Sequence, residues 1–320
     1  MNLAPTQDDI HRARRTIAPY VHRTPILSSR SLGERSGYRV WLKAENLQKT
    51  GSFKARGAMN KMLSLTESER QSGVVTASAG NHGQAVAYAS SLLDTPCYVV
   101  MPASANRSKV AAVRDYGAEA ILHGELWDDA YAHSRVLQQQ KDLTYIHPFC
   151  DRDVVAGQAT IGTEILEDHP TVEAILVPIG GGGLISGIST AIKLAHPEIR
   201  IVGVEAAGSA NMATSRRAGV ATDLGSATTV ADGLSTKRTD PDIFSIVERN
   251  VDDLVTVNDE EIMEAIPFVL ERAKLLVETA GAAAVAALLS GRLELAEGTD
   301  VVAMLCGGNF DVQGKLRFVT

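Results

Sequence analysis

Short apolar runs, rich in β-branched residues, alternate along this chain with segments of helical period. The strand-like runs cover 38–45, 73–78, 96–101, 119–124, 173–179, 200–205 and 300–306. Helical patterns lie between them, for example at 82–92, 107–116, 154–167, 184–195 and 258–274. Near-continuous apolar strands joined by helical crossovers are typical of parallel sheets covered by helices. The alternation therefore predicts an α/β protein.

The length of 320 residues suits one large or two medium domains. We expect a large domain made of residues 1–60 and 150–320. A small domain of residues 61–149 is expected to be inserted into it, with the loop around 144–157 as the seam. No repeat, low-complexity tract or long linker interrupts this organisation.

Composition excludes several classes of partner. Apolar residues make up 45 % of the chain and the net charge is −7, with no basic stripe, so we expect no nucleic acid and no anionic membrane surface as partner. The first residues lack the apolar core of a signal peptide, and no run is long enough to span a membrane. Cys97, Cys150 and Cys306 are far apart, without disulfide or metal-ligand spacing. These features predict a reduced, cytoplasmic protein of enzyme size.

Lys54 lies in TGSFKARG (50–57), where a helix is expected to begin. Thr50 and Ser52 are of the residue types that cap helices. A solvated helix lysine is the ordinary interpretation of such a residue. A reactive amine held at the helix start is the alternative, and this segment alone leaves both open.

A run of glycines follows the strand-like segment in AILVPIGGGGLISG (174–187). Gly180, Gly181, Gly182 and Gly183 let the backbone turn sharply and point several N–H groups inward, just before a helix whose N-terminus is partly positive. Together these features predict an anion cradle suited to phosphate. The ordinary alternative is a flexible turn, which four consecutive glycines fit poorly because they cost entropy on folding.

The glycine run does not match the known nucleotide fingerprints. No register gives GxGxxG, and no Gly-Lys-Ser/Thr follows, so Walker A also fails. Glu205 ends the next strand about where a ribose-binding acid would lie. A dinucleotide site is therefore kept as a minor alternative.

Two more turns follow predicted strands. In SAGNHGQ (78–84), Ser78, Gly80 and Asn81 offer a hydroxyl, open N–H groups and an amide suited to a carboxylate, although an ordinary helix cap explains them as well. His82, taken alone, fits a surface or helix-start residue. In LCGGN (305–309), Cys306 ends a strand where ligands of open α/β sheets bind, and a buried structural cysteine is the default there.

Six segments occur together and in order: KTGSFKARGA, SAGNHGQA, PIGGGGLISG, VADG, VETAGAAAVAAL and CGGN. As a set they resemble the fold-type-II pyridoxal-phosphate (PLP) enzymes, and most closely the threonine/serine dehydratases and serine racemase. The resemblance runs from RTPI (23–26) to GGN (307–309). It implies two parallel-sheet α/β domains of the tryptophan-synthase-β-like architecture.

The resemblance assigns roles to residues of this chain. Lys54 matches the lysine that forms the Schiff base with PLP, which requires an amine that can lose its proton. Phe53 matches the residue packed against the cofactor ring, Asn81 the ligand of the ring 3-oxygen, and Gly233 a backbone contact beside the ring. Gly180, Gly181, Gly182 and Gly183 match the phosphate loop, and Cys306 matches the position facing the pyridine nitrogen. The substrate carboxylate loop corresponds to Ser78, Ala79, Gly80 and His82.

The implied reaction is β-elimination of a β-hydroxy amino acid such as L-threonine or L-serine to a 2-oxo acid and ammonia, with Lys54 as the base at Cα. A neutral Cys306 thiol is a weak donor and should leave the pyridine nitrogen unprotonated, which favours elimination. Racemases of the family resemble SSGNHG, with a serine at the position of Ala79, so alanine favours a dehydratase. A racemase for serine or another amino acid, and a dehydratase specialised for hydroxyaspartate or phenylserine, remain alternatives.

Some relatives bind a divalent metal after the VGVE strand. Glu205 matches the first ligand, Ser209 could give a backbone carbonyl, and Asn211 stands where an aspartate is often found, which should weaken a Mg²⁺ or Ca²⁺ site. A solvated strand-end acid is the ordinary interpretation of Glu205, and both stay open. The resemblance also implies a homodimer or higher homo-oligomer. Since we expect no regulatory domain after residue 320, of the kind that feedback-controlled dehydratases carry, the chain resembles the short catabolic or specialised dehydratases.

Overall fold

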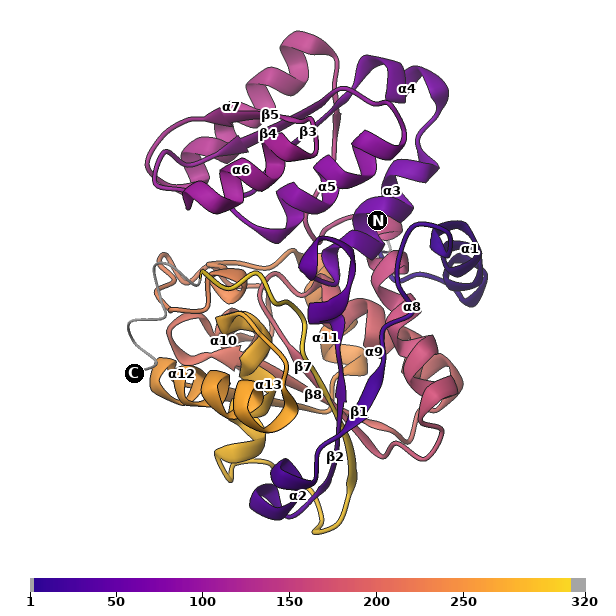
Figure 1. Ribbon diagram of the computed structural model, residues 1–320, viewed down its shortest axis with the longest axis vertical. Coiled ribbons are helices and arrows are strands. Elements are labelled where there is room, and N and C mark those ends of the chain that lie inside the picture. Colours follow the sequence, from indigo (N-terminus) through magenta and orange to yellow (C-terminus); the bar gives the residue numbers. More distant parts are fainter. Residues whose placement is uncertain (1–2, 312–320) are drawn as a thin grey trace.

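Two sheets organise the computed structural model, which describes residues 3–311 (Figure 1). The larger sheet has six strands in the order β1-β2-β10-β7-β8-β9. Only β1 is antiparallel to its neighbour β2; the other pairs are parallel. The strands are β1 (Ile26–Ser28), β2 (Arg39–Lys43), β10 (Asp300–Met304), β7 (Ala174–Pro178), β8 (Arg200–Ala206) and β9 (Asp253–Val257).

The smaller sheet has four parallel strands in the order β5-β4-β3-β6. They are β5 (Glu119–Leu122), β4 (Cys97–Met101), β3 (Val74–Ala77) and β6 (Thr144–Tyr145). The helices of this layer are α4 (Glu67–Ser72), α5 (Asn81–Leu92), α6 (Arg107–Asp115) and α7 (Trp127–Lys141). Figure 1 shows this layer, in purple and magenta, above the layer of the larger sheet.

Further helices surround the larger sheet and join the two layers. They are α1 (Gln7–Ile17), α2 (Arg30–Ser36), α3 (Lys54–Ser64), α8 (Arg152–Asp168), α9 (Gly183–Ala195), α10 (Asn211–Ala218), α11 (Pro241–Asn250), α12 (Asp259–Phe268) and α13 (Thr279–Leu289). Short 3-10 turns lie at η1 (Glu45–Leu47), η2 (Lys49–Gly51), η3 (Ala207–Ser209) and η4 (Asp232–Leu234), and a π turn at η5 (Val269–Ala273). Within residues 3–311, no helix has the length and apolar character needed to cross a membrane.

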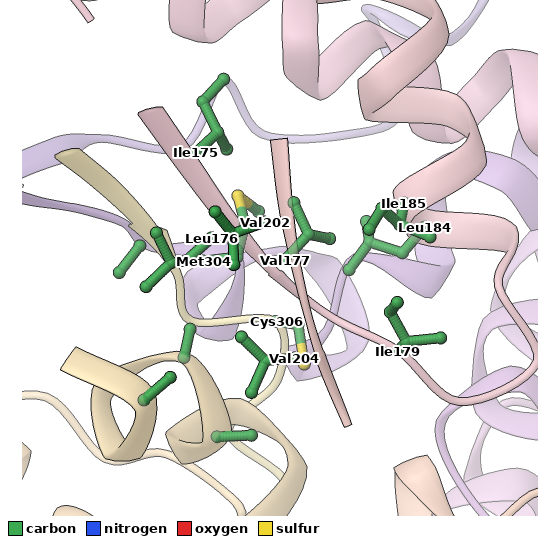
Figure 2. Packing of buried hydrophobic residues seen from close by; sticks show 14 of the residues in the cluster. Ile175, Leu176, Val177, Ile179, Leu184, Ile185, Val202, Val204, Met304 and Cys306 are labelled. Atoms are coloured by element: carbon green, nitrogen blue, oxygen red, sulfur yellow. The ribbon is translucent and has the colours of Figure 1, made fainter. Parts of the chain in front are cut away.

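The main core lies between the larger sheet and its helices. Every residue of β7 and β10 is buried, because both strands are central in the sheet and are covered on both faces. Figure 2 shows Cys306, just beyond β10, among side chains of this core that include Val204 and Ile179. Helix α13 is rich in alanine and is almost wholly buried, since its small side chains allow close packing on the sheet.

The predicted strands are confirmed, whereas β1, β6 and β9 were not predicted. The first two have three and two residues, too few to show a period, and β9 is a half-buried edge strand. The helix expected over 258–274 gives way to the π turn at Val269. The segment 144–157 is not one loop, because β6 occupies its start and α8 begins at Arg152. Since β3 to β6 form a sheet of their own, we propose to keep the division into residues 61–149 and 1–60 with 150–320.

A buried ionic cluster fixes the start of α3 against the larger sheet. Arg56 on α3 binds Glu45 after β2 at 2.8 Å and Glu164 on α8 at 2.7 Å. Lys43 on β2 binds Glu164 at 2.6 Å. All four side chains are buried, and each charge has a partner, as buried charges require. The cluster therefore positions the first turn of α3, which carries Lys54.

Candidate active site

Lys54 is the first residue of α3, and backbone contacts place it beside the end of β10. The segment before it runs against the chain after β10: Gly308 N donates to Gly51 O at 2.8 Å, and Phe53 N donates to Cys306 O at 3.1 Å. Ser52 and Gly307 form a β-bridge between these contacts. The two motifs that are farthest apart in the sequence therefore meet at Lys54.

The Lys54 amine is enclosed by protein, although the residue keeps some exposed surface. Its Nζ donates to Pro148 O at 2.8 Å and lies 5.1 Å from the centre of the Phe53 ring. Burial lowers the pKa of Lys54 to about 8, against the opposing effect of Cys306 and Glu278. With such a pKa about one amine in ten is neutral at pH 7. The structure therefore favours the reactive amine over the solvated helix lysine.

The predicted helix caps of α3 are wrong. Phe53 occupies the N-cap position, and no side chain caps the helix. The hydroxyls of Thr50 and Ser52 are buried without a hydrogen-bond partner among the described residues. Thr50 has φ of 59°, a left-handed conformation that is strained for a β-branched residue.

The four glycines after β7 are held where side chains have no room. A Cβ on Gly181 would collide with the ring of Phe149, and one on Gly183 would lie 2.8 Å from Phe149 Cβ. A Cβ on Gly180 would lie 2.8 Å from Gly233 O, which places the VADG motif against this loop. Gly182 has φ of +92°, a region that glycine adopts without strain. This loop leads directly into α9, so backbone and helix terminus form the predicted cradle.

The turn at 78–82 contacts the same region from the smaller sheet. Gly80 N donates to Ser78 Oγ at 3.2 Å, and Gly80 is the N-cap of α5, with no side-chain cap. Capping by Ser78 or Asn81 is therefore wrong as an explanation of this motif. Ala79 is partly exposed between them.

His82 is a buried residue, contrary to the surface interpretation. Its Nε2 lies 3.0 Å from Ile146 O, and its Nδ1 has no hydrogen-bond partner within residues 3–311. Burial first, and then the charge of Lys54, lower the pKa of His82 to about 3. The imidazole is therefore neutral at physiological pH.

His147 and Phe149 also line this region and were not predicted. His147 Nδ1 accepts the backbone N–H groups of Phe149 at 3.3 Å and Cys150 at 2.8 Å. Burial lowers the pKa of His147 to about 4, so its ring is neutral as well. Their segment, IHPFC, lies in a loop without glycines or a strand–helix signature, so the sequence offered no signal for it.

Cys306 stands at the carboxyl end of β10, as predicted, and is buried. Its Sγ lies 3.5 Å from Ala280 O. Burial, and next the nearby Glu278, raise the pKa of the thiol well above its ordinary value. Cys306 therefore stays a neutral thiol.

Asn81 belongs to a polar chain that sequence reasoning missed. Its Nδ2 donates to Glu278 Oε1 at 2.6 Å, and its Oδ1 accepts from Asn309 Nδ2 at 2.9 Å. Asn309 Nδ2 also donates to Thr50 O at 2.8 Å. Glu278 lies in the VETAG motif just before an alanine-rich helix, and Asn309 lies in the CGGN motif just after a strand. These positions are the sequence signal that could have indicated both residues.

The candidate metal ligands lie beside the cradle, because Asn211 contacts Gly180. Both carboxylate oxygens of Glu205 accept backbone N–H groups, from Met212 and Ala213, at 2.8 Å each, so Glu205 caps α10. It is fully buried, which contradicts the solvated interpretation, and burial raises its pKa to about 7.

In the other two candidates the hydrogen-bonded groups are donors, whereas the side-chain oxygen of Asn211 is buried without a hydrogen-bond partner among the described residues. Asn211 Nδ2 donates to Gly180 O at 3.3 Å and to Thr236 O at 2.9 Å. The Ser209 hydroxyl donates to Leu234 O at 2.8 Å. No cluster of three His, Cys, Asp or Glu side chains suited to a metal occurs in the described part of the chain. One carboxylate and one amide fit a hard divalent cation poorly, and the cation stays a prediction from the sequence.

Polar contacts join the two layers around the site. Asn106, the N-cap of α6, binds Asp311 at 2.5 Å, and Lys109 on α6 pairs with Asp232 at 3.5 Å. Beside them lies a cavity of about 40 Å³ lined by residues of both layers, among them Gly233, Glu278 and Asn309. A larger hollow of about 360 Å³ near Ser90 and Tyr116 touches none of the motifs.

Comparison with known proteins identifies the family. The sequence model described as "Pyridoxal-phosphate dependent enzyme" matches residues 17–307. The chain belongs to this family. L-threonine ammonia-lyase of Thermotoga maritima is 47 % identical over 307 residues, which cover 96 % of this chain and 76 % of that protein.

Solved structures agree with this membership. A threonine deaminase from T.th. is 40 % identical, with a TM-score of 0.90 over 96 % of this chain and 99 % of that one. Maize serine racemase is 38 % identical, with a TM-score of 0.94 over 99 % of this chain and 97 % of that one. Membership in the PLP-dependent family confirms the fold class predicted from the sequence and the cofactor PLP, and it removes the dinucleotide alternative.

The site residues fit this cofactor. Both layers contribute groups to this site. They are an enclosed amine of lowered pKa, a glycine cradle at a helix N-terminus, an amide and a neutral thiol. A carbonyl group, a phosphate, a ring oxygen and a pyridine nitrogen would each find a matching partner among them. The individual roles of these residues stay predictions.

Proposed function

We propose that this protein is a PLP-dependent ammonia-lyase that converts a β-hydroxy amino acid, such as L-threonine or L-serine, to a 2-oxo acid and ammonia. The observation that carries the proposal is the enclosed Lys54 amine, whose pKa of about 8 lets it act both as an imine former and as a base. The relatives named above as a threonine ammonia-lyase and a threonine deaminase support the same reaction.

In this proposal the residues of the chain bind, orient and move protons. Bound PLP would withdraw electrons from the substrate and make its Cα–H acidic. Lys54 takes the proton from Cα, while the backbone N–H groups of Gly180 to Gly183 hold the phosphate. Ser78, Gly80 and the start of α5 receive the substrate carboxylate. The contacts of α6 with Asp232 and Asp311 keep the two layers closed over the site and limit the access of water.

Two residues direct the site toward elimination. The Cys306 thiol is neutral and a weak donor, so a pyridine nitrogen held against it would stay largely unprotonated. Ala79 offers no proton to the face of Cα opposite Lys54. Loss of the β-hydroxyl is therefore favoured over reprotonation of Cα, the step that racemisation requires.

A racemase is the second candidate. The observation that favours it is the structural similarity to maize serine racemase, which extends over nearly the whole chain. Ala79 argues against it, because a racemase needs an acid on each face of Cα. Hydroxyaspartate and phenylserine remain candidate substrates, and we further propose a cytoplasmic homodimer or higher homo-oligomer.

The proposal is tested by Lys54→Ala. The variant should keep its fold by circular dichroism but lose the visible colour of bound PLP and all measurable release of 2-oxo acid, since imine former and base are removed together. Lys49→Ala, five positions earlier in a turn outside the cradle, is the matched control and should keep both. Turnover by Lys54→Ala near the wild-type rate would contradict the assignment of Lys54.

A further inference from the structure

Asn81 is held by partners on both ends of its side-chain amide. On one side its Nδ2 donates to Glu278 Oε1 at 2.6 Å; on the other its Oδ1 accepts from Asn309 Nδ2 at 2.9 Å. Glu278 is buried, and the chain continues from Asn309 to Thr50 O at 2.8 Å. Four motifs that are far apart in the sequence thus meet in one hydrogen-bonded row.

The two ends of the row fix the direction of both amides. A backbone carbonyl and a carboxylate can only accept hydrogen bonds, whereas an amide presents two donors on nitrogen and an acceptor on oxygen. Because Thr50 O only accepts, Asn309 must turn its Nδ2 toward it, and the same Nδ2 meets Asn81 Oδ1. Because the Oδ1 of Asn81 faces Asn309, the Nδ2 of Asn81 is turned toward the Glu278 carboxyl group. One N–H of Asn81 is then committed to Glu278, and the other is left for a ligand.

The backbone around the row is shaped to hold it. Thr50 and Gly51 both have positive φ, 59° and 72°, which brings this turn against Asn309; a Cβ on Gly51 would lie 2.5 Å from Asn309 Oδ1. Glu278 N donates to Gly307 O at 3.0 Å, and a Cβ on Gly307 would collide with Glu278 Oε1. The strained Thr50 conformation and the glycines are explained by the close approach that the row requires.

We propose that Glu278 and Asn309 are positioning residues, which lock the Asn81 amide so that its second N–H faces the ring 3-oxygen of PLP. The inference rests on the proposed function, and it extends that function to two residues with no assigned role. A free amide could present its oxygen to the ring oxygen, and two acceptors facing each other would weaken binding instead of strengthening it. The row removes that orientation.

The test uses the full chain with two cofactors, PLP and 3-O-methyl-PLP, whose methylated oxygen is no longer a phenolate acceptor. Dissociation constants and visible spectra are measured for the wild type, Asn309→Ala, Glu278→Ala and Glu278→Gln. Asn60→Ala is the control, because Asn60 is another buried asparagine that donates to a backbone carbonyl, Asp153 O, at 2.7 Å. Circular dichroism reports whether each variant is folded.

Asn309→Ala and Glu278→Ala should weaken PLP binding at least about tenfold and shift its visible absorption band, since a hydrogen bond to a charged oxygen is lost or misdirected. Glu278→Gln should restore most of the affinity, because its amide oxygen can still accept from Asn81. For 3-O-methyl-PLP the variants should bind as the wild type does. Asn60→Ala should change neither cofactor's affinity nor spectrum.

The outcomes separate the inference from the function that it rests on. If the wild type binds PLP through Lys54 but Asn309→Ala and Glu278→Ala lose the same affinity for both cofactors, the row does not act through the 3-oxygen and the inference is wrong. Unchanged PLP affinity in folded Asn309→Ala and Glu278→Ala would also overturn it. If the wild type takes up no PLP, the proposed function itself fails.

Discussion

At the scale of single residues, Ala79 separates two activities that one scaffold can support. It lies in the turn between Ser78 and Gly80. By the resemblance to the racemases of the family, this position lies on the face of the substrate Cα opposite Lys54. Alanine has no proton to give to that face. Cα should therefore be protonated from one side only, and racemisation of serine should be slow beside elimination.

Ala79→Ser should add the missing acid. Positioned proton transfer is worth on the order of 100-fold or more, so interconversion of serine enantiomers and solvent deuterium exchange at Cα should rise by about that factor. Release of 2-oxo acid should fall. Chiral chromatography of serine after incubation measures the change, with Ala132→Ser on the exposed side of α7 as the control. No gain in Ala79→Ser would mean that the turn holds the substrate differently.

Single residues were predicted well where chemistry left a local signature. Lys54 and the four glycines stand at strand and helix ends, and the structure places them together. Glu278 and Asn309 form hydrogen bonds with Asn81 and Thr50, which are far away in the sequence, and no local pattern reports such pairs. The caps assigned to Thr50 and Ser52 failed for a related reason: Thr50 lies in a left-handed turn that contacts Asn309, far away in the sequence.

At the scale of elements, all central strands of the two sheets were predicted, but of the edge strands only β5 was. Strands β7 and β10 are buried on both faces and read as continuous apolar runs. Edge strands such as β9 bury only part of their surface, so their composition is mixed. The buried cluster of Arg56, Glu45 and Glu164 could not be predicted either, because charged residues are usually exposed and a sequence does not show which of them are buried.

The cradle gives a prediction at this scale. Gly182→Ala places an alanine in a left-handed backbone conformation, with its Cβ 2.6 Å from Ile243 Cγ2. Gly219→Ala is the matched control, since Gly219 has φ of +71° and open space around it. Gly219→Ala should lose about 1–2 kcal/mol in the free energy of unfolding from the left-handed conformation alone, and Gly182→Ala should lose more because of the clash. Only Gly182→Ala should also bind PLP more weakly, by about tenfold or more, since the altered loop no longer presents its N–H groups.

Urea unfolding and cofactor titration of the two variants measure these effects. Loss of stability alone in Gly182→Ala, with wild-type PLP affinity, would place the phosphate elsewhere. An equal loss of PLP affinity in Gly219→Ala would show that the effect comes from general destabilisation and not from the cradle.

At the scale of the whole molecule, the site exists only because two sheets meet. Lys54, the cradle and Cys306 come from the layer of the larger sheet, and Ser78 to His82 come from the smaller one (Figure 1). The order of motifs could predict that both layers contribute. It could not predict the contacts that close them, such as Asn106 with Asp311 and Asp128 with Lys237 at 2.5 Å, because polar surface residues carry no sequence signal for their partners.

The central claim is that the assembled site eliminates water from a β-hydroxy amino acid with PLP as cofactor. The most direct measurement is the release of 2-oxo acid and ammonia by the purified wild-type protein, from L-threonine, L-serine, a hydroxyaspartate and phenylserine, with and without PLP. The account predicts equimolar 2-oxo acid and ammonia from at least one of these substrates, dependent on PLP, and faster than any serine racemisation in the same sample. Absence of 2-oxo acid from every substrate, or racemisation of serine as fast as its deamination, would contradict it.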